Sequence, residues 1–189
     1  PGPPALPGVG NYVLDIASQA GQPLARLYFI DSLAYGPPGV SRYAWISTAQ
    51  VTWFRQQASA ASHLTGLVFF HIPLPEFDLV WQQGRCMGHK LEKVCCPTQN
   101  SGMFAAMRDS AAVAGVFVGH DHINDYEGVL DGIRLCYGRA GGFGSYGSEA
   151  LPRGARVIRL QEGRAGFETW IRLGDGSVLP RPGLDQAES

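Results

Sequence analysis

The segment from Val116 to Asp125 constrains the fold of this chain more than any other. Its first three residues are β-branched or aromatic and predict a strand buried on both faces, and Gly119 allows a sharp turn where that strand ends. His120 and His122 follow at once, at the carboxyl end of the strand, where open α/β sheets usually hold their ligand sites. Because a His-x-His pair can present neutral imidazoles to one metal ion or to two neighbouring ions, this segment predicts a metal site.

Polar side chains accompany the two histidines at Asp121, Asn124 and Asp125. A metal-binding imidazole usually donates its second ring N–H to a carboxylate or carbonyl oxygen, which fixes the orientation of the ring. We therefore expect these three residues to support the histidines from outside the ligand set.

A second apolar run, residues 66–70, also ends in a histidine, His71. Pro73 and Pro75 follow and stop the strand, because proline cannot donate to a sheet ladder. If this run and the run before His120 are neighbours in a parallel sheet, both histidines emerge at the same edge. We therefore predict a metal site formed by His71, His120 and His122.

These motifs carry a family resemblance. Residues 68–76 and 119–125 resemble the two C-terminal metal motifs of calcineurin-like metallophosphoesterases, and most of all those of the purple acid phosphatase-like group. Three further segments resemble stretches of that group in the expected order: residues 27–32, 100–104 and 132–138. The resemblance extends over residues 8–173, with one departure at Leu33, where the group has a glycine.

The resemblance implies an α/β (α+β) fold, the C-terminal half of a metallophosphoesterase αββα sandwich. A mixed sheet with helical crossovers would come first, followed by antiparallel strands. Three earlier motifs of the superfamily are absent from the 189 residues: Asp-x-His, Gly-Asp-x-x-Asp/Tyr and Gly-Asn-His-Asp/Glu. Because the chain also starts Pro-Gly-Pro-Pro, we expect it to be the C-terminal fragment of a longer enzyme.

By the same resemblance, the intact enzyme is a phosphoric ester hydrolase with a dinuclear centre of Fe, Zn or Mn. His71 and His120 would bind one ion and His122 the other, with the remaining ligands in the missing half. The nucleophile would be a metal-bound water, and two cations about 3.5–4 Å apart suit in-line attack on a phosphate ester. The isolated chain should have little activity, because the bridging carboxylate belongs to that missing half, its expected partner.

Two alternatives remain open at this stage. The three histidines could form a mononuclear zinc site with an open fourth position for water. Otherwise the chain could be a non-catalytic half-domain that binds a partner through an uncovered sheet edge.

The overall composition excludes two classes of partner. The formal net charge is −1 and no basic patch stands out, so we expect no nucleic-acid partner. No apolar run approaches the ~20 residues that span a membrane. The compartment is left open.

We expect residues 1–9 to be a flexible leader or truncation point, residues 10–175 to form the C-terminal part of the metallophosphoesterase domain, and residues 176–189 to be a disordered tail. Ser47 and Gln50 have the spacing of a capping box and predict a helix to residue 62, and a second helix is expected over 101–109. Strands are expected at residues 12–16, 24–30, 67–71, 116–119, 133–137, 155–160 and 166–172.

Two further motifs are interpreted as loops. Cys86, His89, Cys95 and Cys96 are poorly spaced for a tetrahedral zinc site, so we predict a surface segment without metal. A disulfide from Cys86 to one of the adjacent pair stays open for an oxidising compartment. Residues 142–147 match the dinucleotide pattern G-x-G-x-x-G, but Pro152 and Gly154 leave no room for the helix that a phosphate site needs.

Overall fold

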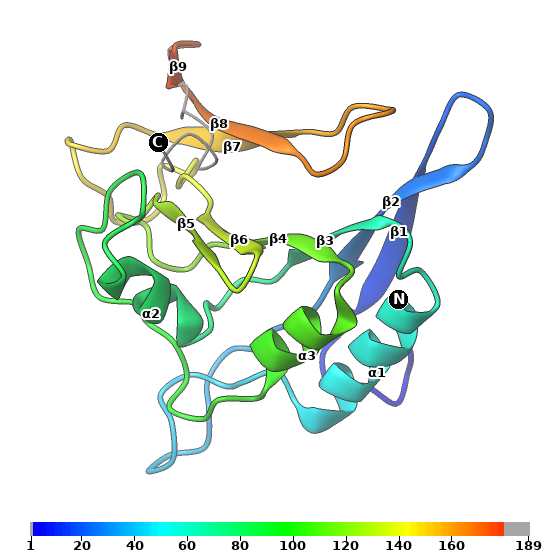
Figure 1. Cartoon of the computed structure of the whole chain (residues 1–189). Coiled ribbons are helices and arrows are strands. Elements are labelled where there is room, and N and C mark those ends of the chain that lie inside the picture. The colour runs from blue at the N-terminus through cyan, green and yellow to red at the C-terminus, as the bar shows by residue number, and fades with distance from the viewer. Residues whose placement is uncertain (1, 180–189) are drawn as a thin grey trace.

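A six-stranded mixed sheet forms the centre of the computed structural model, which describes residues 2–179 (Figure 1). In spatial order the strands are β1 (Tyr12–Ala17), β2 (Pro23–Phe29), β3 (Thr65–Phe69), β4 (Val113–Val118), β6 (Ile133–Tyr137) and β5 (Glu127–Leu130). The four inner strands are parallel, and β1 and β5 pair antiparallel at the two edges. The predicted mixed sheet with helical crossovers is therefore confirmed.

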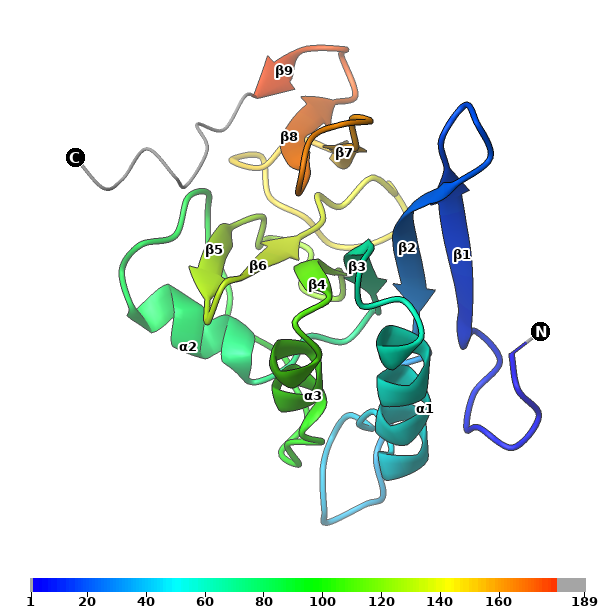
Figure 2. The same ribbon diagram turned by 45° about the vertical axis from the view of Figure 1, so that its right-hand side comes forward.

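Different layers cover the two faces of this sheet. The helices α1 (Thr48–Ser59), α2 (Glu76–Gln82) and α3 (Met103–Ser110) lie on one face. A small antiparallel sheet of β7 (Gly154–Arg159), β8 (Glu168–Leu173) and β9 (Val178–Leu179) lies over the other, as both ribbon views show (Figures 1 and 2). The described residues thus form three of the four layers of the expected αββα sandwich.

The side chains of the central strands alternate between two cores, because successive side chains of a strand point to opposite faces of the sheet. Val68 and Val116 belong to the large core under the helices. Their neighbours Leu67 and Phe117 belong to a smaller core on the side of β7 and β8. The continuous apolar runs of β3 and β4 are therefore explained by burial on both faces.

The two longer helices follow their sequence signals. Ser47 caps α1, and Gln50 completes the predicted capping box by accepting from the Ser47 backbone N–H at 2.8 Å. The helix ends at Ser59 rather than at residue 62. At α3 the N-cap residue is Gly102, and the Ser101 hydroxyl accepts from the N–H of the first helical residue at 3.3 Å.

Three elements were not predicted from the sequence. The helix α2 begins directly after Pro75, since a proline that stops a strand also suits a helix start. The strand β5 pairs with the predicted strand β6 through a turn at Asp131 and Gly132, which both have positive φ, and this Asp-Gly pair is a recognisable hairpin signal. The strand β9 lies at the start of the predicted tail of residues 176–189, where Val178 and Leu179 pair with β8, and residues 180–189 of that tail lie outside the described chain.

Two buried ion pairs link the central sheet to the segments that follow it. Arg139 pairs with Asp125 at 2.5 Å, and Arg156 pairs with Glu127 at 2.7 Å. All four side chains are almost fully buried. These pairs fix the chain after the His-x-His motif against the second sheet.

At the other edge of the sheet, the β1–β2 hairpin carries a partly exposed pair. Arg26 contacts Asp15 through two hydrogen bonds of 2.6 and 2.7 Å. Arg26 also donates to the Gln57 carbonyl of α1, so the hairpin is tied to the helix layer. Among the described residues no helix is long and apolar enough to cross a membrane.

Candidate metal centre

His71 and His120, each two residues beyond the end of β3 or β4, lie together at one edge of the sheet. The Nε2 atom of His71 is 3.4 Å from the Nδ1 atom of His120, and the two rings meet edge to face. The register aligns Phe69 with Phe117, two and three residues before the histidines, so the sheet itself produces this convergence. The expected meeting of His71 and His120 is therefore present in the structure.

Backbone conformation at the end of β4 shapes this contact. His120 has a φ of 72°, in the left-handed region that residues with side chains rarely adopt. Gly119 has no side chain to obstruct the histidine pair: a Cβ there would lie 3.2 Å from the Nδ1 atom of His71. Unusual backbone conformations of this kind gather at functional sites.

The surroundings keep both imidazoles of the pair neutral. Burial lowers the pKa of His71, and the charges of His120 and His122 lower it further. The Asp121 carboxylate raises this pKa and so opposes part of the shift. Burial also lowers the pKa of His120, again with Asp121 opposing the shift. A neutral imidazole is the form that binds a metal ion, so the electrostatics suit two metal ligands.

His122 stands apart from this pair. Its ring stacks on Tyr146 with the centroids 4.3 Å apart, and its Nδ1 atom lies 3.3 Å from the Tyr146 carbonyl oxygen. Within residues 2–179 no three His, Cys, Asp or Glu side chains are grouped so that they could hold one ion. The structure therefore does not assemble the three histidines into the single zinc site that was left open from the sequence.

The polar residues expected behind the histidines have other described partners. Asp121 Oδ2 accepts from the Tyr137 hydroxyl at 2.7 Å and from the Cys95 N–H at 3.1 Å. Asn124 Oδ1 accepts from the N–H groups of residues 91 and 92. Both side chains fix the segment that contains the predicted 86–96 loop, and their support of the imidazoles stays a prediction.

Asp125 also contacts the 86–96 segment, through His89, and pairs with Arg139. Its Oδ1 atom accepts from the His89 N–H at 2.8 Å, while Oδ2 forms the buried ion pair with Arg139. The described role of Asp125 is therefore to hold the backbone around the motif. Its predicted place behind a metal ligand is not tested by these contacts.

The four cysteines are free thiols in the structure. The disulfide that was left open from Cys86 is thus not formed here. Burial raises the pKa of Cys95 to about 11, with Asp121 as the next cause. Cys136 is fully buried in the smaller core, where a free cysteine behaves as a small apolar side chain.

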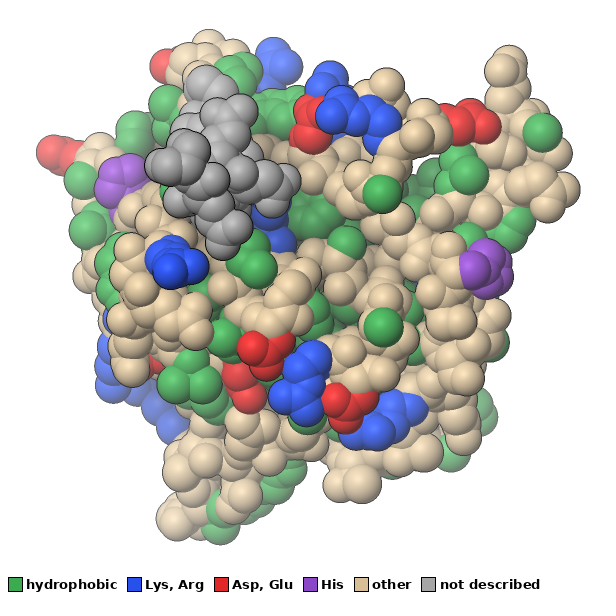
Figure 3. Space-filling view, viewed as in Figure 1, with side chains coloured by type: hydrophobic (Ala, Val, Ile, Leu, Met, Phe, Trp, Pro, Cys, Tyr) green, Lys and Arg blue, Asp and Glu red, His purple; other side chains and the backbone are tan. Residues whose placement is uncertain are grey.

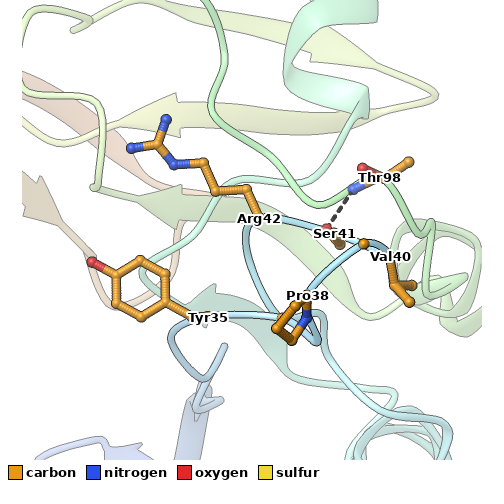
Figure 4. Close-up of a pocket in the computed structure, with 8 residues that line it drawn as sticks. Tyr35, Pro38, Val40, Ser41, Arg42 and Thr98 are labelled. Carbon is orange, nitrogen blue, oxygen red and sulfur yellow. Dashed lines mark hydrogen bonds between the residues drawn. The ribbon is translucent and has the colours of Figure 1, made fainter.

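A loop after β2 borders the histidine pair. Tyr43 contacts the His120 ring edge to face with the centroids 4.5 Å apart, and the Arg42 guanidinium lies 5.3 Å from the centre of the Tyr43 ring. Tyr35 and Arg42 line a surface hollow of about 450 Å³. Figure 4 shows both side chains extending from this loop on the same side. The Ser41 hydroxyl accepts from the Thr98 N–H at 3.0 Å and braces the loop.

The loop begins with the residue that departs from the family pattern. Leu33 has a φ of 61°, a conformation that favours glycine, and its N–H donates to Asp31 at 2.8 Å. The turn is therefore kept although the glycine is missing. Sequence reasoning did not find Arg42, Tyr43, Glu92 or Tyr146, because they lie in loops without periodicity or motif spacing.

The histidine pair fits a metal ion by geometry. Two nitrogens 3.4 Å apart match two ligands that bind one ion at ~2.1 Å with a roughly tetrahedral angle. Imidazole nitrogen suits zinc and iron, and the lowered pKa values keep the lone pairs available. His71 and His120 are thus placed so that they could share one ion, while His122 lies outside this pair, against Tyr146.

Comparison with solved structures identifies the fold. The chain matches the crystal structure of a dimetal phosphatase from Danio rerio with a TM-score of 0.53, at 14% sequence identity, over 84% of this chain and 60% of that one. At this identity the likeness shows the fold, which is that of a dimetal phosphatase. No protein-family model matches the chain.

Comparison with curated proteins defines the family. The chain is 35% identical to "Probable inactive purple acid phosphatase 14" and "Probable inactive purple acid phosphatase 29" of Arabidopsis thaliana, each over 90% of its length. It is 34% identical to "Phosphatase DCR2" of Saccharomyces cerevisiae over 88% of its length. The chain spans about half the length of the plant relatives, 49% and 51%, and 32% of the yeast protein.

The chain belongs to the purple acid phosphatase-like metallophosphoesterases and corresponds to their C-terminal region. The family that the motifs at residues 68–76 and 119–125 predict is thereby confirmed.

Proposed function

We propose that this chain supplies three metal ligands of a dinuclear, metal-dependent phosphoric ester hydrolase. The observation that carries the proposal is the 3.4 Å approach of His71 Nε2 and His120 Nδ1 at the carboxyl edge of the sheet. His71 and His120 bind one ion, and His122, which lies outside this pair, binds the other. The family supports phosphatase chemistry in general, and the metal centre is our addition to it.

The ions proposed are iron, zinc or manganese, which accept imidazole and carboxylate ligands. When bound, two such ions activate water and neutralise the oxygens of a phosphate ester. The residues around the histidines orient these ligands, and Arg42 adds a positive charge. Arg42 lies beside Tyr43, which contacts His120, and its positive charge at this edge suits an anionic substrate.

We further propose that the remaining half of the same domain is the partner of this chain. Three alternating side chains of β1 are exposed on the face opposite the helices: Tyr12 (41%), Leu14 (51%) and Ile16 (38%). Tyr12 stacks on Phe29, the first contact of a row of stacked rings that continues through β3 to β4. An apolar sheet face of this kind suits a packed second layer. The missing ligands and the bridging carboxylate would come from that half.

A non-catalytic role is the second candidate. The two plant relatives are named as probable inactive phosphatases, which favours a protein that has kept the fold without the chemistry. Such a chain would use the same apolar face to bind its partner but would need no metal. Metal binding by the histidines therefore separates the two candidates.

The test is a phosphomonoester assay with zinc, manganese or iron supplied. The chain of residues 1–189 alone should show little turnover, because each ion lacks most of its ligands. A protein that joins this region to the remaining half of the domain should be active, and His120→Ala should abolish that activity.

The matched control is His63→Ala, which removes an exposed histidine beyond the end of α1 and should leave turnover unchanged. Ordinary enzyme rates from residues 1–189 alone would contradict the division of ligands. An inactive joined protein that binds no metal would favour the non-catalytic candidate.

A further inference from the structure

Two segments without a role in the proposed chemistry meet at His122. One is the cysteine-containing segment 86–96, which supplies Glu92, and the other is the glycine-rich segment 142–147, which supplies Tyr146. They come from opposite sides of the His-x-His motif in the sequence. Their meeting suggests that they act on the one histidine that stands apart from the pair.

The first contact fixes the hydrogen of the His122 ring. The Tyr146 carbonyl oxygen lies 3.3 Å from His122 Nδ1, and a carbonyl can only accept. A hydrogen on Nδ1 has an acceptor here and a bare Nδ1 lone pair has none, so the contact favours the Nδ1–H tautomer, in which the lone pair of Nε2 is free. Metal-binding histidines commonly donate their other ring N–H to a backbone carbonyl in this way.

The second contact fixes the plane of the ring. The Tyr146 and His122 rings stack with an interplanar angle of 23°, so His122 cannot rotate without displacing Tyr146. The Tyr146 hydroxyl in turn donates to Glu92, with O···O distances of 2.9 and 3.0 Å to the two carboxylate oxygens. Glu92 Oε1 also accepts from the Ile123 N–H at 2.9 Å. One carboxylate thus connects the tyrosine ring to the backbone directly after His122.

The backbone of the glycine-rich segment is held as well. Arg153 Nη2 donates to the Tyr146 carbonyl at 3.0 Å and to the Ser145 carbonyl at 2.7 Å. Gly147 allows this approach, because a Cβ there would lie 2.5 Å from Arg153 Nη2. The carbonyl that accepts from His122 is therefore fixed in position from both sides.

We propose that Tyr146 and Glu92 are positioning residues that hold the His122 imidazole in its Nδ1–H tautomer with Nε2 free for a metal ion. This inference rests on the proposed function, since it assigns the free nitrogen to the second ion. It also gives the glycine-rich segment a definite role, because the segment supplies an acceptor and a stacking ring for one ligand.

The test measures the tautomer of His122 directly, by ¹⁵N NMR of the ring nitrogens in the 1–189 chain at a pH where imidazole is neutral. Wild type should show a protonated Nδ1 and an unprotonated Nε2. Tyr146→Ala and Glu92→Ala should give the mixed tautomers of an unrestrained imidazole, and Tyr146→Phe, which keeps the ring, should give a partial shift. The spectra of His71 and His120 should not change, which shows that the sheet is intact.

Phe143→Ala is the matched control. Phe143 is an aromatic residue of the same segment, 87% exposed, and its loss should leave the His122 tautomer as in wild type. Mixed tautomers in the wild-type chain would overturn the proposal. So would a His122 spectrum that is unchanged in Tyr146→Ala and Glu92→Ala, or one that changes equally in Phe143→Ala.

A zinc titration of the same samples separates this inference from the proposed function. Zinc should shift the Nε2 signal of His122 in wild type, and about 10–100-fold more zinc should be needed in Tyr146→Ala. A fixed tautomer without any response of His71, His120 or His122 to zinc would support the positioning and overturn the metal-dependent function. Equal zinc responses in wild type and Tyr146→Ala would overturn the positioning itself.

Discussion

Removal of the Asp125 carboxylate should be one of the most destabilising single changes in this chain. Asp125 is fully buried and forms an ion pair with Arg139, whose side chain is only 2% exposed. In Asp125→Ala the guanidinium keeps one described acceptor, the Pro152 carbonyl at 2.8 Å, and its Nε atom already has no partner among the described residues. The His89 N–H loses its acceptor as well. Breaking one side of a buried ion pair costs about 3–5 kcal/mol, so we expect a loss of that size.

The assay is urea denaturation of the metal-free chain, followed by tryptophan fluorescence. The double variant Asp125→Ala/Arg139→Ala should recover part of the loss, because it also removes the unpaired buried cation. Asp109→Ala is the control, since Asp109 pairs with Arg108 on the surface and should matter little. If Asp125→Ala is no more destabilising than Asp109→Ala, the structural role assigned to Asp125 is refuted.

Three further predictions concern backbone, site and charge. Ala111→Gly should stabilise the chain by about 1 kcal/mol, because φ is 51° at this exposed end of α3 and glycine adopts a positive φ without strain. Ala49→Gly inside α1 should destabilise the chain by a similar amount. Urea denaturation midpoints measure both changes. Gly119→Ala should weaken zinc binding about tenfold in a calorimetric titration, because the new methyl displaces the His71 ring. Asp15→Asn should make the free energy of unfolding less dependent on pH in acid. The hydrogen bond from Arg26 lowers the pKa of Asp15, so its contribution to stability is complete above about pH 4 and is lost as the pH falls further. Urea denaturation at several pH values measures this.

The central sheet could be predicted from the sequence because each of its inner strands is marked by the residue types of a short, continuous segment. Apart from Thr65, β3 and β4 contain only apolar residues and glycine, and each is followed two residues later by a histidine at the carboxyl edge of the sheet. The approach of His71 and His120 follows from that register. The hairpin of β5 and β6 had an equally local signal in Asp131 and Gly132, which was overlooked.

What the sequence did not reveal depends on contacts between distant loops. Glu92 and Tyr146 are 54 residues apart and meet only because Asn124 and Asp125 hold the 86–96 segment against the His-x-His turn. Neither residue has a spacing or periodicity that marks it. The separation of His122 from the histidine pair agrees with the family resemblance, but the spacing of the residues alone gives no sign of it, because it arises from the turn after His120.

The charges on the face seen in Figure 3 are mixed, with basic side chains lying beside acidic ones. This face shows no extended basic stripe of the kind that binds nucleic acid. The expectation of a phosphate ester substrate therefore depends on the histidine edge and Arg42, not on the charge of this face.

Anomalous diffraction at the zinc edge, from crystals of the chain soaked with zinc, tests the central claim most directly. We expect one peak between His71 Nε2 and His120 Nδ1, and any second peak at His122 Nε2. Absence of zinc at the His71–His120 pair, or one ion held by all three histidines, would contradict it.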